Sequence, residues 1–566
     1  MRYLIFTTDY DGTLASNDHV TPLSLQALAR LKATGRKLIL VTGRQLEELK
    51  SVFPEYPIFD RIVAENGALI YQPATLELKL LGERPPENFL DCLRRKNVPF
   101  SAGHVIVATW EPHHHAVLEA IKETGAEYQL IFNKGAVMVL PPAVNKATGL
   151  REALKELEQC LHNVVAIGDA ENDNAMLQAA ECAIAVSNAL PAVKAVADWT
   201  TGQPAGEGVT ELINRLIDDD LAGLDQQLSR HYLEIGLEMN TSPLMISPYG
   251  SKVLLAGPSG FGKTTLTAAF MEKLIAKQYQ FCLIDPEGDY QDFPGVINIG
   301  NSIQPPAIDH IIDLLAQPEE NIAVCILAIA LEERPDFFRR LLTAIIDLRT
   351  RTGHPHFLIL DEAHHLLPAA YAACYYNMPD DFTNFFAVTT QPRLLCSDFL
   401  RRVNIALLMG EAPDQAMQAF SSLTEAQIVL PDNLVFQKGD ILVWQQGNTT
   451  ARLARGDMPS RVLMRHKRKY ASGDMHENSF FFTGPSRRLN LKANNLMLFI
   501  QIGRGIDDET WLFHLHRHDY SKWFRYAVKD EKLAMAAAHI EDQGLNAEGS
   551  RQAIFHAILE RYTAPA

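Results

Sequence analysis

The chain is poor in cysteine, and no two of its cysteines form a CxxC pair. Seven cysteines are scattered over 566 residues, an odd number at irregular spacing. This scarcity excludes a disulfide-rich scaffold and argues against a zinc site, because zinc-binding motifs usually hold their cysteines in close pairs. It is typical of a protein that stays in the reducing cytoplasm.

Long apolar runs and an excess of positive charge are also missing. No apolar run of about 20 residues occurs, so no membrane span is predicted. The apolar start of the chain reaches Phe6 and soon meets Asp9, which is too short for a signal peptide. The net charge of −16 argues against a broadly basic surface for nucleic acid, although it allows a local basic channel.

What is present is an alternation of short apolar strands with helical stretches, over a length that suits about three domains. We predict an α/β chain whose residues 1–218 form a doubly wound, Rossmann-like core. A small αβ cap interrupts this core at about 81–141. A linker at 219–245 leads to a second α/β domain at 246–464. Residues 470–566 are predicted to be mainly helical, with a role that the sequence does not reveal.

Two aspartates come directly after the first apolar strand. Asp9-Tyr-Asp11-Gly-Thr13 follows the run Tyr3–Phe6. A carboxylate at such a strand end can attack a phosphate ester and form an aspartyl-phosphate. We therefore predict that Asp9 is the nucleophile. Asp11 would protonate the leaving oxygen and afterwards activate water.

Later strands supply the cationic and polar groups that a phosphoryl site requires. Thr42 follows the run Lys37–Val41 and can bind a phosphoryl oxygen, with the Gly43 amide nearby. Lys146 opens a helical stretch and can neutralise phosphate charge. Both are predicted to be catalytic.

A further pair of carboxylates follows the run Val164–Ile167. Asp169 and Asp173 belong to the segment Gly-Asp-Ala-Glu-Asn-Asp. Carboxylate oxygens are the ligands that Mg²⁺ prefers, so we expect both residues to bind Mg²⁺ together with Asp9 and Asp11. Ligands of doubly wound sheets bind beyond the carboxyl ends of the strands, which is where these residues are expected.

These motifs resemble those of the haloacid-dehalogenase superfamily, and within it the subclass IIB phosphatases of the Cof and sucrose-phosphatase type. The resemblance covers about the first 215 residues. It implies a Mg²⁺-dependent phosphomonoesterase that acts on a small, sugar-type phosphate, while the short cap also allows phosphoglycolate or a nucleotide. The matching segments are Asp9–Thr13, Thr42–Arg44, Ala64–Gly67, Lys146, Gly168–Asp173 and Asn188–Pro191.

A second phosphate motif lies far downstream, after the run Lys252–Ala256. Gly257-Pro-Ser-Gly-Phe-Gly-Lys-Thr264 has the spacing of a Walker A loop and precedes a helical stretch. Backbone amides of such a loop, together with a helix N-terminus, hold nucleotide phosphates. We predict ATP binding there, with Thr264 also on Mg²⁺. The predicted ATP-binding residues of this loop are Gly257, Gly260, Gly262, Lys263, Thr264 and Thr265.

Two carboxylates and an amide would complete this second site. Asp361 and Glu362 follow the run Phe357–Leu360, as a Walker B pair does. Asp361 would support Mg²⁺, and Glu362 would polarise the attacking water. Gln391, after another apolar run, could sense the γ-phosphate.

The second domain resembles the HerA/FtsK branch of P-loop ATPases, over about residues 230–460. The resemblance implies a ring hexamer that pumps DNA or polypeptide, with a trans-acting arginine for which Arg393, Arg401 and Arg402 are candidates. Three interpretations follow. The chain is a phosphatase coupled to an ATPase, it is a nucleic-acid-associated translocase or defence ATPase with an attached phosphatase, or it is a binding module in which ATP assembles a ring scaffold. Net charge disfavours the second, because phosphate contacts supply most non-specific affinity for nucleic acid.

The C-terminal stretch holds closely spaced histidines and aspartates, including His514 and Asp519. A metal site and an ordinary helical core are the two interpretations. We favour the core, which Trp511 and Trp523 would fill, because a metal site requires a convergence of ligands that spacing alone does not show.

Overall fold

The computed structural model describes the chain except for positions 134, 240, 292, 371–381, 432–435, 438, 461–474, 476–478, 486–488, 529 and 561–566. The chain divides into two compact units. The first contains Met1–Pro286 and Gly295–Met458, and the second contains Glu287–Pro294 and Pro459–Ala566. The predicted boundary at 464–470 lies outside the described residues. No helix in the described part of the chain is both long and apolar enough to cross a bilayer.

The first unit begins with a sheet that is parallel except at one edge. Strands β12 to β3 pair in parallel, whereas β4 and β5 are antiparallel. The predicted Rossmann-like core is confirmed, and the antiparallel pair is an addition that the alternation of strands and helices did not indicate. The spatial order is β12 (Trp199–Thr200), β11 (Cys182–Ala185), β10 (Val164–Gly168), β1 (Ile5–Thr8), β2 (Lys37–Val41), β3 (Arg61–Ala64), β4 (Leu69–Gln72) and β5 (Glu77–Leu80).

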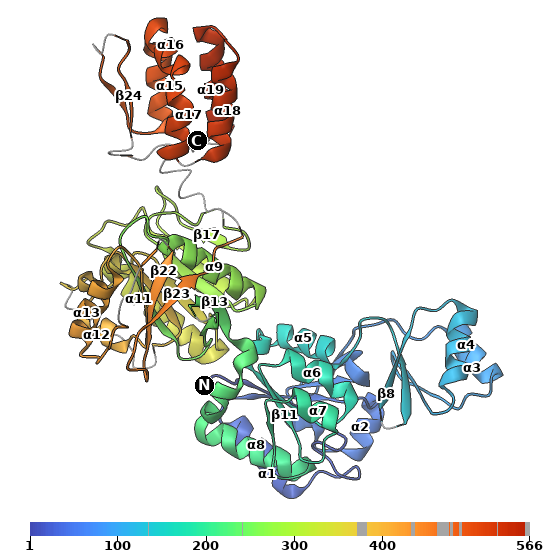
Figure 1. Cartoon of the computed structure of the whole chain (residues 1–566). Coiled ribbons are helices and arrows are strands. Elements are labelled where there is room, and N and C mark those ends of the chain that lie inside the picture. Colours follow the sequence, from blue (N-terminus) through green and yellow to red (C-terminus); the bar gives the residue numbers. More distant parts are fainter. Residues whose placement is uncertain are drawn as a thin grey trace. The chain divides into compact units, whose positions relative to one another are not determined.

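Helices connect these strands and cover the sheet (Figure 1). They are α1 (Pro22–Ala33), α2 (Leu46–Val52), α5 (Lys146–Glu156), α6 (Asn174–Ala179), α7 (Pro191–Val196) and α8 (Ala205–Asp219). Helix α1 begins where the Thr21 side chain accepts a hydrogen bond from the Ser24 amide. Helix α5 begins with a capping box between Asn145 and Thr148. This cap fixes Lys146, because Lys146 is the first residue of α5.

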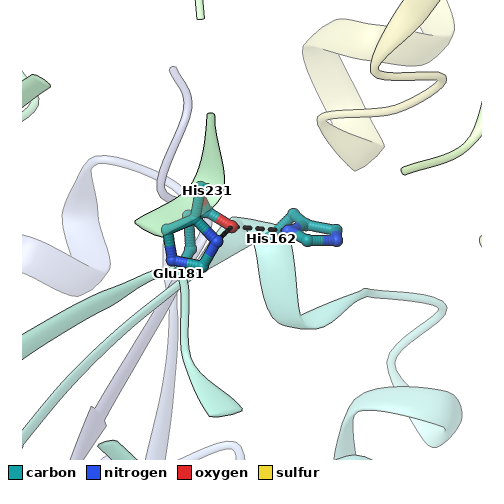
Figure 2. Close-up of side chains that lie close together, drawn as sticks. All are labelled: His162, Glu181 and His231. Atoms are coloured by element: carbon teal, nitrogen blue, oxygen red, sulfur yellow. Dashed lines mark hydrogen bonds and ion pairs between the residues drawn. The ribbon is translucent and has the colours of Figure 1, made fainter. Parts of the chain in front are cut away.

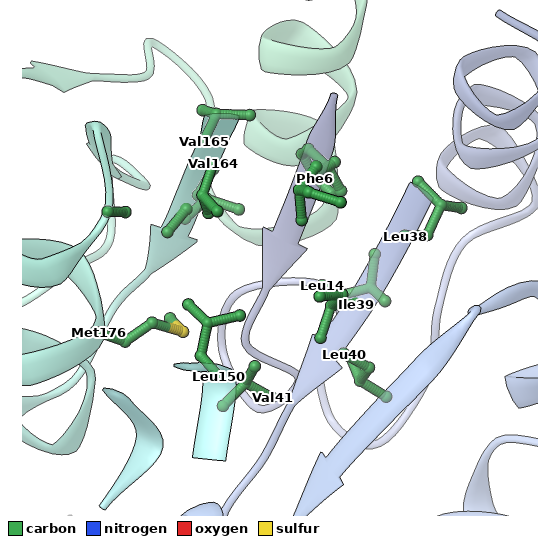
Figure 3. Packing of buried hydrophobic residues seen from close by; sticks show 14 of the residues in the cluster. Phe6, Leu14, Leu38, Ile39, Leu40, Val41, Leu150, Val164, Val165 and Met176 are labelled. Carbon is green, nitrogen blue, oxygen red and sulfur yellow. The ribbon is translucent and has the colours of Figure 1, made fainter. Parts of the chain in front are cut away.

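The core around this sheet is built from apolar side chains of the parallel strands and of the segments packed against them (Figure 3). Phe6, Leu40 and Val164 are fully buried. Strands that are covered on both faces are continuous apolar runs, which explains why they were recognisable in the sequence. In the register, Ile5 lies beside both Lys37 and Val164, so β1, β2 and β10 end at one edge of the sheet.

A small αβ cap is inserted between β5 and α5. Its sheet has the order β6 (Ser101–Ala102), β7 (Val107–Trp110), β9 (Ala136–Leu140) and β8 (Gln129–Asn133). Helices α3 (Glu87–Arg95) and α4 (His114–Thr124) pack on one face of this sheet through Phe89 and Val117 (Figure 1). Met138 and Ile131 belong to a separate apolar cluster with Ala68 of the core.

A second sheet occupies the rest of the first unit. Strands β21 to β17 pair in parallel, and the four strands beyond β21 pair antiparallel. Part of the predicted linker 219–245 is built into this sheet as β13. The order is β14 (Pro243–Ile246), β13 (Leu233–Glu238), β23 (Arg452–Gly456), β22 (Asp440–Gln445), β21 (Ile405–Leu408), β15 (Lys252–Ala256), β20 (Phe385–Thr389), β19 (Phe357–Leu360), β16 (Phe281–Asp285), β18 (Ile322–Cys325) and β17 (Ile297–Ile299).

The helices that accompany the second sheet follow its parallel strands. They are α9 (Lys263–Ala276), α10 (Ile308–Leu315), α11 (Arg334–Thr352), α12 (Ser397–Arg402) and α13 (Pro413–Thr424). Phe338, Leu341 and Ile345 of α11 are buried in the core of this part. The arginines of α11 lie on its remaining faces. Arg340 and Arg351 are exposed, whereas Arg349 donates hydrogen bonds to the carbonyls of Pro355 and Thr383.

The second unit is a helical bundle with a short hairpin. It contains β24 (Phe480–Phe482), β25 (Leu491–Ala493), α15 (Leu496–Gly505), α16 (Asp508–His516), α17 (Asp519–Tyr526), α18 (Glu531–Asp542) and α19 (Ala547–Leu559). Trp511 is fully buried, and its indole donates a hydrogen bond to Ser550. His514 accepts a hydrogen bond from the Thr483 amide and pairs with Asp519 at 2.9 Å. These contacts fit the interpretation of this stretch as a helical core.

Helix α5 packs so closely on the first sheet that Gly149 leaves no room for a side chain. A Cβ atom at this position would lie 2.5 Å from Val63 Cγ1 and 2.7 Å from Gly67 Cα. We expect Gly149→Ala to lower the free energy of unfolding by about 1–3 kcal/mol, the usual cost of overpacking. Calorimetry of the full chain would measure the loss. Gly202→Ala is the matched control, because its Cβ would meet nothing closer than 3.5 Å. Equal melting temperatures for the two variants would contradict this prediction.

Candidate functional site

The predicted phosphoryl-transfer residues meet at the carboxyl edge of the first sheet. Asp9 follows β1, Thr42 follows β2, and Asp169 follows β10. The Asp9 amide donates a hydrogen bond to the Ile167 carbonyl at 3.0 Å, which continues the pairing of β1 and β10 one residue further. Parallel strands that end at one edge thus bring together residues up to 160 positions apart in the sequence, as expected for a doubly wound sheet.

Lys146 is the centre of this site. Its ammonium lies 2.5 Å from Asp9 Oδ1 and 2.6 Å from Asp173 Oδ1, and all three side chains are buried. Burial disfavours the charged form of Lys146, but the charges of Asp173 and Asp9 outweigh it, so the pKa of Lys146 lies above its ordinary value. Lys146 therefore stays positively charged between two carboxylates.

Three buried carboxylates gather here around that single ammonium. Asp9, Asp169 and Asp173 each offer an oxygen, and these oxygens lie within 4.8 Å of one another. Burial, and after it the charge of Asp173, raises the pKa of Asp9 to about 8, although Lys146 acts in the opposite direction. The crowding leaves an excess of negative charge. A set of oxygen donors of this kind fits a divalent cation such as Mg²⁺.

Asp173 and Asp169 are held by the turn that follows β10. The Asp173 carboxylate accepts hydrogen bonds from the amides of Asp169 and Ala170 at 2.9 and 3.0 Å. Thr13 donates a hydrogen bond to Asp169 Oδ1 at 3.2 Å. The carboxylates of Asp169 and Asp173 therefore keep their orientation through backbone and hydroxyl contacts.

Asp11 lies outside the carboxylate cluster. Arg44 donates hydrogen bonds to both of its oxygens, at 2.8 Å to Oδ2 and 2.6 Å to Oδ1. Asp11 is partly exposed, so it lies at the mouth of the site rather than at its base. Thr42 is fully buried, and its hydroxyl accepts a hydrogen bond from the Arg44 amide. The sequence motif contained Arg44, but its contact with Asp11 was not predicted.

Glu65 fastens the cap to the core, a role that the sequence analysis missed. Its buried carboxylate accepts hydrogen bonds from the amides of His104, Val105 and Ile106 at 2.8–3.0 Å. A Cβ atom on Gly103 would lie 2.6 Å from Glu65 Oε1, so a glycine is required beside this carboxylate. In the sequence, only the place of Glu65 in the motif Ala64–Gly67 indicated that this residue is important.

The cap also reaches the base of the site. A Cβ atom on Gly43 would lie 3.5 Å from Met138 Sδ and 3.6 Å from Asn172 Nδ2. Asn172 in turn donates a hydrogen bond to Asn66 at 3.1 Å. The apolar side chain of Met138 therefore lies next to the Thr42–Gly43 segment, where a phosphoryl group is expected.

The glycine loop of the second sheet lies between β15 and α9. Gly260 and Gly262 have φ values of 88° and 102°, in the left-handed region that favours glycine. A Cβ atom on Gly257 would lie 2.4 Å from the Met409 carbonyl oxygen, so the backbone passes close to the end of β21. Lys263 is the first residue of α9 and is buried, and Thr264 and Thr265 follow it in the first turn.

The remaining predicted nucleotide residues follow neighbouring parallel strands. Asp361 and Glu362 come after β19 and are buried, and Glu362 has a left-handed φ of 39°. His364 pairs with the Thr389 hydroxyl at 3.1 Å, which links this turn to the end of β20. Gln391 lies exposed just beyond β20. Because β15, β20 and β19 are adjacent and parallel, these turns share one edge of the sheet.

The arginine candidates lie near the same part of the second sheet. Arg393 belongs to the exposed turn after Gln391. Arg401 and Arg402 end α12, and Arg401 pairs with Glu425 at 3.3 Å. Their predicted action on a neighbouring subunit stays a prediction.

Comparison with known proteins concerns the part of the chain that contains the Asp9 site. A family model for haloacid dehalogenase-like hydrolases matches residues 6–113 and 103–213. A solved haloacid dehalogenase-like hydrolase from Bacteroides thetaiotaomicron aligns at 20% identity and a TM-score of 0.34, over 38% of this chain and 99% of that chain.

Two curated relatives match over the same part. Phosphoglycolate phosphatase 2 of Saccharolobus solfataricus is 29% identical over 220 residues, which are 38% of this chain and 92% of that protein. Phosphoglycolate phosphatase of Methanothermobacter thermautotrophicus is 30% identical over 220 residues, which are 37% of this chain and 96% of that protein. Through its N-terminal part, the chain belongs to the family of haloacid dehalogenase-like hydrolases.

Proposed function

We propose that the N-terminal part of the chain hydrolyses a small phosphomonoester through a covalent intermediate on Asp9. The observation that carries the proposal is the buried cluster of Asp9, Asp169 and Asp173 around the Lys146 ammonium. A carboxylate nucleophile needs nearby positive charge to approach an anionic phosphate, and a carboxylate set needs a cation to be stable when buried. Both demands are met if the cluster binds Mg²⁺ and the phosphoryl group together.

In the proposed reaction Asp9 Oδ2 attacks phosphorus, since Lys146 holds Oδ1. The bond to the ester oxygen breaks, and Asp11, which must be protonated and released from Arg44 at this step, gives its proton to the leaving oxygen. Water then attacks the aspartyl-phosphate, Asp11 takes up the proton, and inorganic phosphate leaves as Asp9 is restored. Thr42 and Lys146 contact the phosphoryl oxygens. Mg²⁺, held by Asp9, Asp169 and Asp173, would supply further positive charge.

A small substrate is supported by the cap. Met138 lies beside Gly43, and its register partners Ala108 and Ile131 are also apolar. At the Met138 register position the cap therefore offers no side chain that could bind the hydroxyl groups of a large sugar, because specific recognition of a hydroxyl requires a polar partner. Two relatives bear the name phosphoglycolate phosphatase. We propose phosphoglycolate or a phosphate ester of similar size, and a sugar phosphate is the alternative.

Replacing the nucleophile tests the reaction. We expect Asp9→Asn to lower kcat for phosphoglycolate or a generic phosphomonoester by more than about 1,000-fold, because no covalent intermediate can form. We expect the variant to fold, because Asp173 still pairs with the Lys146 ammonium and asparagine occupies nearly the same volume as aspartate. Activity would be followed by release of inorganic phosphate with Mg²⁺ present.

Asp218→Asn, at an exposed position on α8, is the matched control and should retain wild-type activity. Turnover by Asp9→Asn that equals this control would refute the assignment of the nucleophile. Wild-type activity that survives complete removal of divalent cations would refute the metal requirement.

Replacing Met138 of the cap with a smaller residue tests whether the cap limits the size of the substrate. We expect Met138→Ala to raise kcat/KM for a hexose phosphate relative to phosphoglycolate by about tenfold, because the space beside Gly43 opens. The comparison needs steady-state kinetics with both esters. Leu118→Ala, at an exposed position on α4, is the control and should leave the ratio unchanged. An unchanged ratio in Met138→Ala would show that the cap does not limit the size of the substrate.

A second candidate activity, ATP binding and hydrolysis, is favoured by the geometry of the glycine loop. Its strand–loop–helix arrangement, the left-handed glycines and the buried Asp361 and Glu362 on a nearby parallel strand are typical of P-loop ATPases. Strand β15, which leads into the glycine loop, lies in the middle of the sheet. It is flanked by β20 and β21, and β19 lies next to β20. We propose that ATP binding controls the activity of the phosphatase. A nucleic-acid translocase or a ring-shaped scaffold are the alternatives.

Substitutions in the loop test ATP binding. We expect Lys263→Ala to weaken ATP binding by about 10- to 100-fold through loss of a charged contact with phosphate. Glu362→Gln should bind ATP but lose hydrolysis, since only the activation of water is removed. Calorimetric titration and a phosphate-release assay measure the two effects. Lys273→Ala, on the same helix, is the control. Unaltered ATP affinity in Lys263→Ala would refute the nucleotide site.

A further inference from the structure

Three metal-ligating side chains meet at the edge of the first sheet that lies opposite Asp9. His162 belongs to the turn before β10, Glu181 directly precedes β11, and His231 ends the turn Ser229–His231 that comes before β13 (Figure 2). Asp9 follows a strand of this parallel sheet, whereas Glu181 precedes one, so the cluster is separate from the phosphoryl-transfer site.

The two imidazoles converge on one oxygen of Glu181. His162 Nδ1 lies 2.5 Å from Glu181 Oε2, and His231 Nδ1 lies 3.6 Å from the same oxygen (Figure 2). One ligand atom from each residue can be chosen so that all three lie within 4.8 Å of one another. Two histidines and a carboxylate are a ligand set that zinc uses, with a further position for water.

The other side of Glu181 is held in place. Tyr279 donates a hydrogen bond that is shared between Oε1 at 3.1 Å and Oε2 at 3.3 Å, and the Arg2 guanidinium lies 3.7 Å from Oε1. Arg2 also pairs with Asp225, so its charge is shared between two carboxylates. Oε2 is thus directed towards the histidines, much as outer-shell hydrogen bonds orient carboxylates that bind metals.

The hydrogen bond of His162 Nε2, the ring nitrogen that faces away from Glu181, determines which tautomer the neutral ring adopts. His162 Nε2 lies 2.9 Å from the Lys277 carbonyl, which can only accept, so Nε2 carries a hydrogen. In the neutral ring, the lone pair of Nδ1 then points at Glu181. A backbone carbonyl on the remote nitrogen is the usual outer-shell partner of a histidine that binds a metal.

At 2.5 Å, His162 Nδ1 and Glu181 Oε2 share a proton. A metal ion that replaces this proton would separate the two atoms to about 3 Å, because Zn–N and Zn–O bonds are about 2 Å long. A proton would serve His162 alone, because His231 Nδ1 is too far from Glu181 for a hydrogen bond. A metal ion would serve all three groups at once. We propose that His162, Glu181 and His231 bind a divalent transition metal, with Zn²⁺ as the favoured ion.

This site would join the turn Ser229–His231 to the N-terminal core. Two ligands come from the core and the third from the stretch that leads into the second sheet. Tyr279 stacks on His162 with a centroid distance of 3.7 Å, so the second sheet also contacts the site. The absence of CxxC pairs argued against zinc, and that argument does not extend to a site whose ligands are histidine and glutamate. His162, Glu181 and His231 are separated by 19 and 50 residues, so they form no local sequence motif.

The test uses the full chain with Asp169→Asn as background, so that metal binding at the Asp9 site is weakened. Metal-free protein is incubated with Zn²⁺ or Co²⁺ and dialysed, and bound metal is measured by mass spectrometry. We expect one equivalent of metal, a visible Co²⁺ spectrum of four-coordinate type, and a higher melting temperature with Zn²⁺. Adding His231→Ala should lower affinity at least tenfold and remove the rise in melting temperature.

Two outcomes would overturn the proposal. Equal metal binding with and without His231→Ala would exclude His231 as a ligand. Absence of retained metal and of a visible Co²⁺ spectrum in the Asp169→Asn protein would show a proton-bridged ion pair instead. The Co²⁺ spectrum is decisive even if His231→Ala fails to fold, because it is recorded on protein with intact ligands.

Discussion

The buried contact of Lys146 with Asp9 and Asp173 is the interaction on which the N-terminal core depends. A charge this deep in a protein is tolerated only when it is paired, and here one ammonium faces two carboxylates at 2.5 and 2.6 Å. Three parts of the chain must therefore meet at this contact. They are the end of β1, the turn after β10 and the first residue of α5. The capping box at Asn145 and the close packing at Gly149 both hold α5 where this contact requires it.

The sequence was sufficient to predict the strands and the residues that follow them. Apolar runs covered on both faces stand out, and a polar residue after each run falls at the carboxyl edge of a parallel sheet. Asp9 and Asp169 follow their strands and lie close to Asp173 and Lys146, while their roles in catalysis stay predictions. The prediction that Asp11 joins them at the metal stays untested, and in the structure its carboxylate pairs with Arg44.

Contacts between distant side chains could not be predicted in the same way. No local pattern tells that the Glu65 carboxylate meets three amides some 40 residues away, or that Met138 lies beside Gly43. The stretch 219–245 was expected to be a linker with a leading strand. Pairing of β13 with β14 and β23 gives this stretch partners that only the folded sheet supplies.

The contact of Glu65 with the cap has a consequence for how this architecture can vary. All three amides that bind this carboxylate lie within His104–Ile106, whereas Met138 and Ile131 belong to later strands. The attachment of the cap and the apolar side chain that lies beside Gly43 therefore come from separate stretches of chain. Loss of the carboxylate would leave three donors without their acceptor. Because Val137 and Val139 of β9 are buried on the opposite face, substitutions that keep both the packing of the cap and its anchor are confined to the face of Met138.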